Sequence, residues 1–408
     1  MKLKTLVSAT ISIFLLAGCG NTGRAINNGN GVLKPHVPPK ETLDLPQKYL
    51  EYLKKEPNKE EKKMLTWINW YRKQSGLDPV VYNSKLHMSA KAHAIYSYKN
   101  NGYGHYETKG NQYYFGEAPV NRMANADYKY GYGEDISYYG EGRAAIDNLI
   151  TAIYHRHPIL DMDITEVGCG AYGRYNVVDF GVKPKNIHRK EYVLYPPKDG
   201  IIPLGSFWGE NPNPLKGTGA YKSGVPISID FDRTSGCDID MDSFKLYDNH
   251  NREVDTLKVM TAENDPNEFF TPCQFALFPR NILKQEIKYR AEFKYNGDQK
   301  VAWTFRVRES RPEIKDATYY EVTKNKQIFE VKADKKYIFH ISAPNIELDS
   351  DILEDSDIKV EAEYDLTVGR VSGKERYFYV EDISEFEGDK AIITIKKLNL
   401  KIGLKLVE

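Results

Sequence analysis

The feature that most constrains the fold is a change of hydrophobic period near residue 200 of the 408-residue chain. Before it, apolar residues recur at helical spacing, as at Met64, Trp67, Ile68 and Tyr71, and Gly76 follows where a C-terminal cap belongs. After it, short runs alternate apolar and polar residues between turns, which is the period of half-buried strands. The pattern therefore predicts an α+β protein with its helices in the N-terminal part.

The N-terminal part predicts three helices and a hairpin. The first helix is followed by a second over 84–99 and a third over 143–154. Between these two, residues 102–142 are rich in Gly and Tyr and predict a long irregular loop. A hairpin of two strands over 166–182 follows. This order favours an α-β-α sandwich domain that ends near residue 184.

The remaining residues predict two β modules. Residues 200–310 are expected to form an Ig-like β-sandwich, and residues 312–408 a separate C-terminal β domain after Arg311-Pro312. The last run, Ala391–Val407, alternates Leu or Ile with polar residues, several of which are Lys. The strand-like runs of the first module are Val225–Phe231, Phe244–Tyr247, Phe275–Phe278, Tyr289–Tyr295 and Val301–Val307.

The N-terminus predicts the compartment. Lys2 and Lys4 precede an apolar stretch that is too short for a membrane-spanning helix and suits a signal peptide. The stretch ends in Leu-Ala-Gly-Cys, which resembles a bacterial lipobox, although an ordinary signal peptide with a chance Cys is the alternative. We therefore expect removal of residues 1–18, lipidation of Cys19, and a flexible tether over 19–40. The protein would face the extracytoplasmic side of the cell membrane, held there by lipid.

Composition narrows the partners. Lys and Arg number 57, and so do Asp and Glu, so there is no basic surplus to meet the phosphates of nucleic acid. Four Cys in so long a chain exclude a disulfide scaffold. Cys237 and Cys273 could form a disulfide outside the cytoplasm or remain two buried thiols.

The residues suited to chemistry lie in the N-terminal domain. His105, Tyr106 and Glu107 open the expected loop, Glu134 lies within it, and His155 follows the third helix. Two imidazoles and a carboxylate that converge on a cleft suit Zn²⁺ or another borderline divalent cation. Without a metal, the same groups could act as general acid and base, or form a buried polar network that shapes the loops.

Six short motifs follow one another between residues 62 and 184. They are Asn69-Trp70-Tyr71-Arg72, Gly76-Leu77-Asp78-Pro79-Val80, the helix with Ala90, His93 and Ala94, Gly104-His105, Gly133-Glu134-Asp135-Ile136, and Tyr154-His155-Arg156 with Ile159-Leu160. In this order they resemble the CAP superfamily of cysteine-rich secretory, antigen 5 and pathogenesis-related proteins. The similarity is greatest to the bacterial branch of SCP-like extracellular domains, which lacks the animal-type disulfides.

The resemblance implies a cleft with two His and two acidic residues. Carried over by position, His105, Glu134 and His155 would be the metal ligands, and Glu134 the catalytic base if the protein is a hydrolase. The helix position where many members have a Glu is Ala152 here, which leaves the fourth member open. The candidate substitutes are Glu107, Asp147 and Glu166.

The ligand cleft is expected to be lined by Tyr106, Glu107 and Arg156. His93, on the apolar face of its helix, is expected to be a buried core residue. Asp135 departs from the resemblance, because it stands where the family has Asn after the Glu.

The expected function is that of a cell-surface lipoprotein whose CAP domain binds a wall- or peptide-derived envelope ligand without catalysis. The cofactor would be Zn²⁺ or another divalent metal, or none, and the lipid at Cys19 would make the membrane a partner. One alternative is a metal-assisted hydrolase of peptides or wall polymers. The other is a structural envelope or adhesion protein, since fold similarity alone does not supply an activity.

Overall fold

The structure, a computed structural model, describes most of the chain after residue 36. The predicted signal peptide and Cys19 lie outside the described residues, and of the predicted tether only two strands, β1 (Ile26–Asn27) and β2 (Leu33–Lys34), and residues 37–40 are described. The described ranges are 26–27, 33–34, 37–308, 311–312, 314–342, 355–371, 374 and 376–407.

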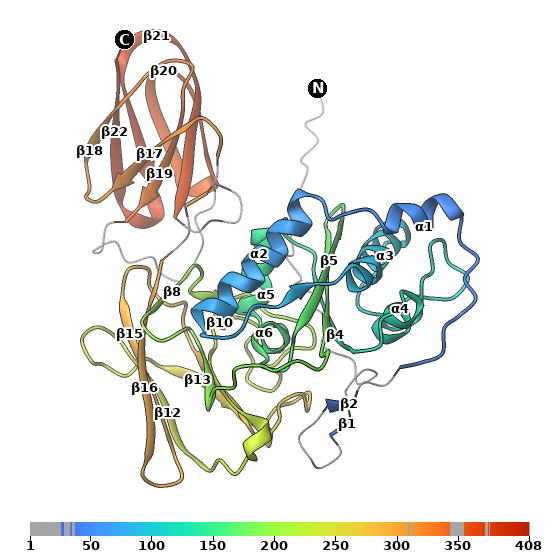
Figure 1. The fold of residues 1–408 in the computed structure, drawn as a ribbon. Helices are drawn as coiled ribbons and strands as arrows, with labels where there is room; N and C mark the ends of the chain where they lie inside the picture. Colours follow the sequence, from blue (N-terminus) through green and yellow to red (C-terminus); the bar gives the residue numbers. More distant parts are fainter. Residues whose placement is uncertain are drawn as a thin grey trace. The chain divides into compact units, whose positions relative to one another are not determined.

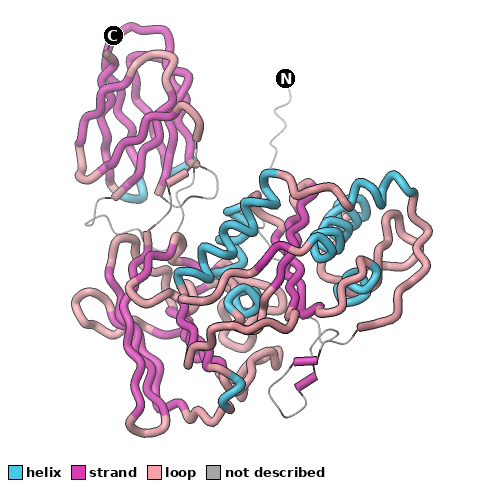
Figure 2. Tube along the Cα trace, in the orientation of Figure 1, coloured by secondary structure: helices cyan, strands magenta, loops and turns pink. Residues whose placement is uncertain are grey.

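The chain divides into two compact units. The first comprises Met1–Tyr195, Phe207–Asp240 and Leu257–Phe278, and the second contains the rest. The predicted fold class is confirmed: all the described α-helices lie in the N-terminal part, and all-β modules follow (Figure 2). The first unit thus draws in residues well beyond 184, the expected end of the CAP domain.

A four-stranded sheet lies at the centre of the N-terminal part, in the order β3-β5-β6-β4. Helices α3 and α4 cover one face, with α1 packed against α3, and α2, α5 and α6 cover the other face (Figure 1). Gly168 and Gly170 of β5 allow this layering, because a Cβ at either position would collide with the backbone of α3. The strands are β3 (Val81–Tyr82), β4 (Gly131–Ser137), β5 (Glu166–Tyr172) and β6 (Tyr175–Gly181).

Asparagine side chains begin the two long helices. Asn58 accepts hydrogen bonds from the backbone N–H groups of Glu60 and Glu61, and the Glu61 carboxylate accepts from Asn58 N–H in return. Asn83 caps α3 by accepting from the backbone N–H groups of Lys85 and Leu86, and Asn101 ends the helix in the left-handed region at φ 50°. The helices are α1 (Gln47–Leu53), α2 (Lys59–Gln74), α3 (Ser84–Asn100), α4 (Pro119–Asn125), α5 (Arg143–Thr151) and α6 (Ile153–Leu160).

Two predictions for this part were wrong. The expected irregular loop at 102–142 contains α4 and β4, because Pro119 begins a helix and β4 is held by antiparallel pairing with β6. The expected third helix over 143–154 is two helices, separated by Ala152 in an extended conformation. Both differences depend on residues far away in the chain: β4 pairs with β6, and Glu210 binds the start of α6. Local sequence patterns do not report such contacts.

A second sheet completes the first unit. Its order is β13-β14-β11-β7, with antiparallel pairing of β11 to both β14 and β7. The strands are β7 (Tyr192–Tyr195), β11 (Ile227–Phe231), β13 (Thr256–Met260) and β14 (Gln274–Pro279), and short elements nearby are β9 (Ser206–Phe207), β10 (Ser223–Gly224) and η1 (Arg233–Ser235).

The second unit is built from strands. One sheet has the order β12-β15-β16-β8, and the other has the order β17-β19-β21-β22-β18 with β20 paired to β21. The bounds are β8 (Gly200–Ile202), β12 (Met241–Tyr247), β15 (Lys288–Tyr295), β16 (Gln299–Val307), β17 (Ala317–Val322), β18 (Gln327–Val331), β19 (Lys336–Ile341), η2 (Asp355–Asp357), β20 (Ile358–Arg370), β21 (Tyr377–Ile395), η3 (Lys396–Leu398) and β22 (Leu400–Leu406).

The expected single run at 391–407 is the end of one strand, a turn, and a second strand that folds back on the first. Strands β21 and β22 pair antiparallel, and Asn399 in the left-handed region follows the turn at η3. Leu398, Leu400, Ile402 and Leu404, which the period of two puts on one face, are buried in the core of this module, and Leu406 on the same face is partly buried.

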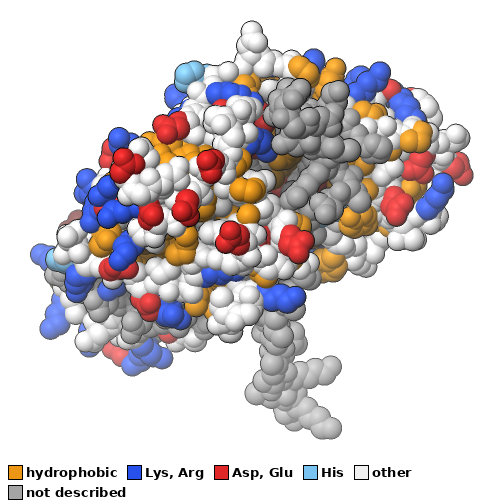
Figure 3. Space-filling view, turned by 90° about the horizontal axis from the view of Figure 1, so that it is seen from below, with side chains coloured by type: hydrophobic (Ala, Val, Ile, Leu, Met, Phe, Trp, Pro, Cys, Tyr) orange, Lys and Arg blue, Asp and Glu red, His pale blue; other side chains and the backbone are white. Residues whose placement is uncertain are grey.

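The surface agrees with the balanced composition. On the face seen in Figure 3, Lys and Arg side chains are interspersed with Asp and Glu. None of the described helices is long and apolar enough to span a membrane.

Candidate functional site

Two of the three predicted metal ligands lie in contact. His105 Nδ1 lies 2.8 Å from Glu134 Oε1, and both side chains are buried. The other carboxylate oxygen of Glu134 accepts a hydrogen bond of 2.6 Å from Arg122 Nη2. Arg122 also donates to the His105 carbonyl at 2.9 Å, so the guanidinium holds both members of the pair. The strand β4 supplies Glu134, and α4 supplies Arg122.

The network continues to Glu107. Its carboxylate lies 2.9 Å from His93 Nδ1 and 3.7 Å from Arg122 Nε, and it accepts from the backbone N–H groups of Phe115 and Gly116. His93 is buried, as expected for a core residue, and its Nε2 lies 3.0 Å from the Gly104 carbonyl. We call His93, His105, Glu107, Arg122 and Glu134 the Glu134 network. Every member is at most 3% exposed.

Charge balance fixes the protonation states of Glu134 and Arg122 in this network. Burial on its own would raise the pKa of Glu134, but Arg122, His93 and His105 outweigh it and hold the pKa well below its usual value. Burial likewise favours the neutral form of Arg122, yet Glu134, Glu107 and Asp179 raise its pKa. Glu134 is therefore an ion-paired carboxylate throughout the physiological pH range.

His155 has a different partner. Its Nδ1 lies 2.8 Å from Glu210 Oε2, and both side chains are buried. Glu210 also accepts from the backbone N–H groups of Ile153 at 2.8 Å and Tyr154 at 3.1 Å. It thereby caps α6, which Ala152 cannot do. His155 Nε2 is buried with no hydrogen-bond partner among the described residues. We call His155 and Glu210 the Glu210 pair.

Strand geometry explains why these centres are separate. Glu134 and Asp135 are adjacent in β4, and adjacent strand residues face opposite sides of a sheet. The Glu134 side carries Asp179 of β6 as the cross-strand partner. On the Asp135 side, burial first, and then the charges of Glu210 and Glu134, raise the pKa of Asp135 well above its usual value. Its carboxylate oxygens have no hydrogen-bond partner in the described part of the chain.

The predicted cleft residues do not share one surface. Tyr106 is 51% exposed, whereas Glu107 is buried in the Glu134 network. Arg156 is fully buried, donates to the Pro226 carbonyl at 2.8 Å and Ser228 Oγ at 3.1 Å, and stacks over the Tyr195 ring at 4.0 Å. Burial lowers its pKa to about 10. Ligand binding at these residues stays a prediction.

The suggested substitutes for the fourth acid have other contacts. Asp147 accepts from the Tyr71 hydroxyl at 2.6 Å, and Glu166 accepts from Tyr128 at 2.8 Å and from Asn83. The acid that contacts His155 is instead Glu210. No motif identifies it, because it lies in a Gly- and Pro-containing segment beyond the six motifs.

A metal ligand set is not assembled in this conformation. Across the residues that the structure describes, no group of three or more His, Cys, Asp or Glu could hold a metal ion. His105 and Glu134 belong to one network and His155 to another pair, so the arrangement does not fit a three-ligand zinc site. Binding of zinc or another divalent metal stays a prediction.

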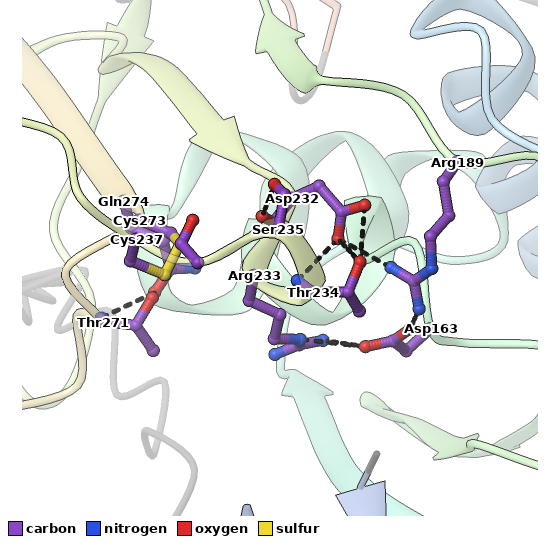
Figure 4. Close-up of a disulfide and its surroundings, with 11 residues drawn as sticks. Asp163, Arg189, Asp232, Arg233, Thr234, Ser235, Cys237, Thr271, Cys273 and Gln274 are labelled. Atoms are coloured by element: carbon purple, nitrogen blue, oxygen red, sulfur yellow. Dashed lines mark hydrogen bonds and ion pairs between the residues drawn. A yellow bond between two sulfur atoms is a disulfide. The ribbon is translucent and has the colours of Figure 1, made fainter. Parts of the chain in front are cut away.

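The first unit has a second polar cluster near its disulfide (Figure 4). Arg189 pairs with Asp163 and, at 2.8 Å, with Asp232. Arg233 pairs with Asp161 at 2.6 Å and with Asp163 at 2.8 Å. A cavity of about 40 Å³ lies among these residues. Since the Asp residues follow α6 or border β11, these pairs fasten the helical part to the second sheet.

Cys237 and Cys273 form a disulfide beside this cluster, with their Cα atoms 4.9 Å apart. Of the two outcomes left open by the sequence, the disulfide is the one found. Cys169 is a buried free thiol.

Comparison with known proteins supports the motif assignment. Residues 65–182 match the model of the cysteine-rich secretory protein (CAP) family. A search of curated proteins found no match. Among solved structures, an extracellular SCP-domain protein from Bacillus anthracis str. Ames is 18% identical, with a TM-score of 0.29, over 35% of this chain and 45% of its own. The alignment thus spans less than half of that chain.

A second similarity among solved structures has a lower TM-score. The N-terminal Ig1-2 module of the Drosophila receptor protein tyrosine phosphatase DLAR is 10% identical, with a TM-score of 0.15, over 52% of this chain and 95% of its own. The family match, together with the helix-sheet-helix layers, shows that this chain carries a CAP domain at its N-terminus, followed by all-β modules.

Proposed function

We propose that this protein is an extracytoplasmic lipoprotein whose CAP domain is a non-catalytic binding scaffold at the cell envelope. The Leu-Ala-Gly-Cys motif ending at Cys19 supports a lipid anchor. The Cys237–Cys273 disulfide supports an oxidising compartment, because such bonds persist outside the cytoplasm.

The observation that carries the non-catalytic role is the pairing of Glu134. A general base works best with a pKa near the operating pH. Glu134 is buried, ion-paired to Arg122 and bound to His105, and its pKa lies far below that range. A substrate would have to displace both partners before it could reach the carboxylate.

The test compares cleavage of candidate ligands with their binding. Cys19→Ser full-length protein would be incubated with peptidoglycan fragments and a mixed peptide library, and both bound material and cleavage products would be measured. We expect retention of one class without products. Reproducible cleavage by the purified protein, lost in Arg122→Gln or Glu134→Gln protein that stays folded, would contradict the proposal.

The anchor is tested separately. Cell fractionation should place the unmodified chain in the membrane fraction and the Cys19→Ser chain in the soluble extracytoplasmic fraction. An identical distribution of the two chains would overturn the lipid anchor without affecting the binding role.

A further inference from the structure

An apolar pocket opens beside the edge of the central sheet. It shares no residue with the Glu134 network. It lies between α2 and β5, which are neighbours in Figure 1, and its volume is about 160 Å³. Leu65 of α2 and Tyr82 of β3 form walls, and Val167 and Cys169 of β5 lie at the base. An apolar cavity near this volume accommodates a group the size of benzene.

The neighbouring strand is the free edge of the sheet. Among the strands that the structure describes, β3 pairs with β5 alone, in parallel. Val81 N–H donates to the Thr165 carbonyl, and Asn83 N–H donates to the Val167 carbonyl. In such a ladder the intervening residue, Tyr82, directs its own N–H and C=O away from β5. Tyr82 also lines the pocket, so a backbone donor–acceptor pair with no strand partner in the described part of the chain lies next to an apolar cavity.

The pocket also carries charges of both signs. Lys62 and Glu56, which are exposed, contribute to its lining, and neither makes an ion pair within the part of the chain that the structure describes. Glu61, by contrast, is buried and bound to the backbone of Asn58 and Ala171. An occupant with an acidic and a basic group could therefore pair with Lys62 and Glu56.

From these three features we infer that this pocket, between α2 and β5 and beside β3, binds an extended peptide segment of a partner protein. One apolar side chain of about the size of Leu or Phe fills the cavity, and the peptide backbone exchanges hydrogen bonds with Tyr82. Charged residues on either side of the anchor meet Lys62 and Glu56. This inference rests on the proposed binding role and names the ligand class and the site.

The experiment uses Cys19→Ser full-length chain and a fluorescent peptide with the sequence Asp-Thr-Leu-Thr-Lys. Fluorescence anisotropy would measure its affinity, and a peptide with Ala in place of Leu would be the control ligand. We expect saturable binding of the Leu peptide and at least tenfold weaker binding of the Ala peptide. No binding of the Leu peptide up to 1 mM would overturn the inference.

Protein variants locate the site. Leu65→Trp fills the cavity and should abolish binding, and Lys62→Glu should weaken it severalfold. Lys73→Glu makes the same charge change at an exposed position in the last turn of α2 and should bind as the parent does. If Leu65→Trp protein, folded by circular dichroism, binds as tightly as the parent, the peptide lies elsewhere and the inference is wrong.

The free thiol gives an independent readout. Burial raises the pKa of Cys169, and in the Cys19→Ser chain it is the one cysteine outside the disulfide. The Leu peptide should slow its alkylation by N-ethylmaleimide. If benzene slows the alkylation of Cys169 and the peptide does not, the pocket binds a small apolar ligand and the peptide inference is wrong. Cleavage activity would overturn the proposed function but leave these binding results standing, so the two failures are distinguishable.

Discussion

At the scale of single residues, the centre of the CAP domain is defined by ionisable groups that have lost water. Such groups are tolerated when they are paired, because the desolvation of an isolated charge is costly. Glu134 and Arg122 satisfy one another, whereas Asp135 has no hydrogen-bond partner in the described part of the chain. Glu134 and Asp135 are neighbours in one strand, but they should have opposite effects on the free energy of unfolding. The paired Glu134 should stabilise the fold, and Asp135 should weaken it.

Replacing Asp135 by Asn should therefore stabilise the protein. Because the folded-state pKa of Asp135 is raised, the folded chain keeps a proton that the unfolded chain releases above about pH 4. Stability should fall as pH rises from there toward the raised pKa. Asp135→Asn should remove this slope and add about 1–3 kcal/mol at pH 7. Thermal unfolding from pH 4 to 8 would show it, with exposed Asp316→Asn as control; a lower Tm at pH 7 would contradict it.

Replacing Glu210 by Gln should destabilise the first unit. The charge lost is the one that caps α6 and binds His155. Loss of a buried charged acceptor should cost about 2–4 kcal/mol. Denaturant unfolding would measure this against exposed Glu263→Gln. Equal stability of the two variants would mean that Glu210 does not cap the helix.

The sequence placed His105 and Glu134 in one expected site, but it gave no indication of Glu210. His105, Glu107 and Glu134 lie in motifs whose order is recognisable, and two of the three predicted metal ligands are in contact. Glu210 approaches His155 from a segment 55 residues away in the chain. Neither periodicity nor a short motif reports a partner at that separation.

At the scale of elements, local patterns predicted the elements that stabilise themselves. The helical periodicity of α2 and α3, Gly76 after the end of α2, and the alternation in β15 and β16 agree with the structure. β4 was missed because its sequence, Gly-Tyr-Gly-Glu-Asp-Ile-Ser, has no strand alternation and its charged residues are buried by pairing with β6. The break at Ala152 was missed for the same reason: a distant carboxylate holds the helix that follows.

The disulfide should stabilise the second sheet of the first unit. It closes a loop with a sequence separation of 36 residues, for which the chain-entropy estimate is about 3–4 kcal/mol. Dithiothreitol should therefore lower the Tm of the parent chain. The Cys237→Ser/Cys273→Ser variant should start from that lower Tm and be insensitive to the reductant. A parent Tm unchanged on complete reduction would contradict the estimate.

At the scale of the whole molecule, the compact unit is larger than the family match. Residues 65–182 match the family model, but Glu210, Pro226 and Arg233 complete contacts of His155, Arg156 and Asp161 in the same unit. The predicted boundary at 184 cuts these contacts. Residues 41–184 expressed alone should therefore lack cooperative thermal unfolding, whereas residues 37–308 should retain it. A cooperative transition of the short segment with native Tm would show that the CAP domain is independent.

The central claim is that Glu134, ion-paired to Arg122, stabilises the fold. The most direct measurement is the free energy of unfolding of full-length Glu134→Gln in denaturant, with exposed Glu117→Gln from the same region as the matched control. Because the substitution leaves Arg122 buried without its carboxylate, we predict a loss of about 3–5 kcal/mol for Glu134→Gln. The control should change by less than about 0.5 kcal/mol. Equal or greater stability of Glu134→Gln would contradict the account.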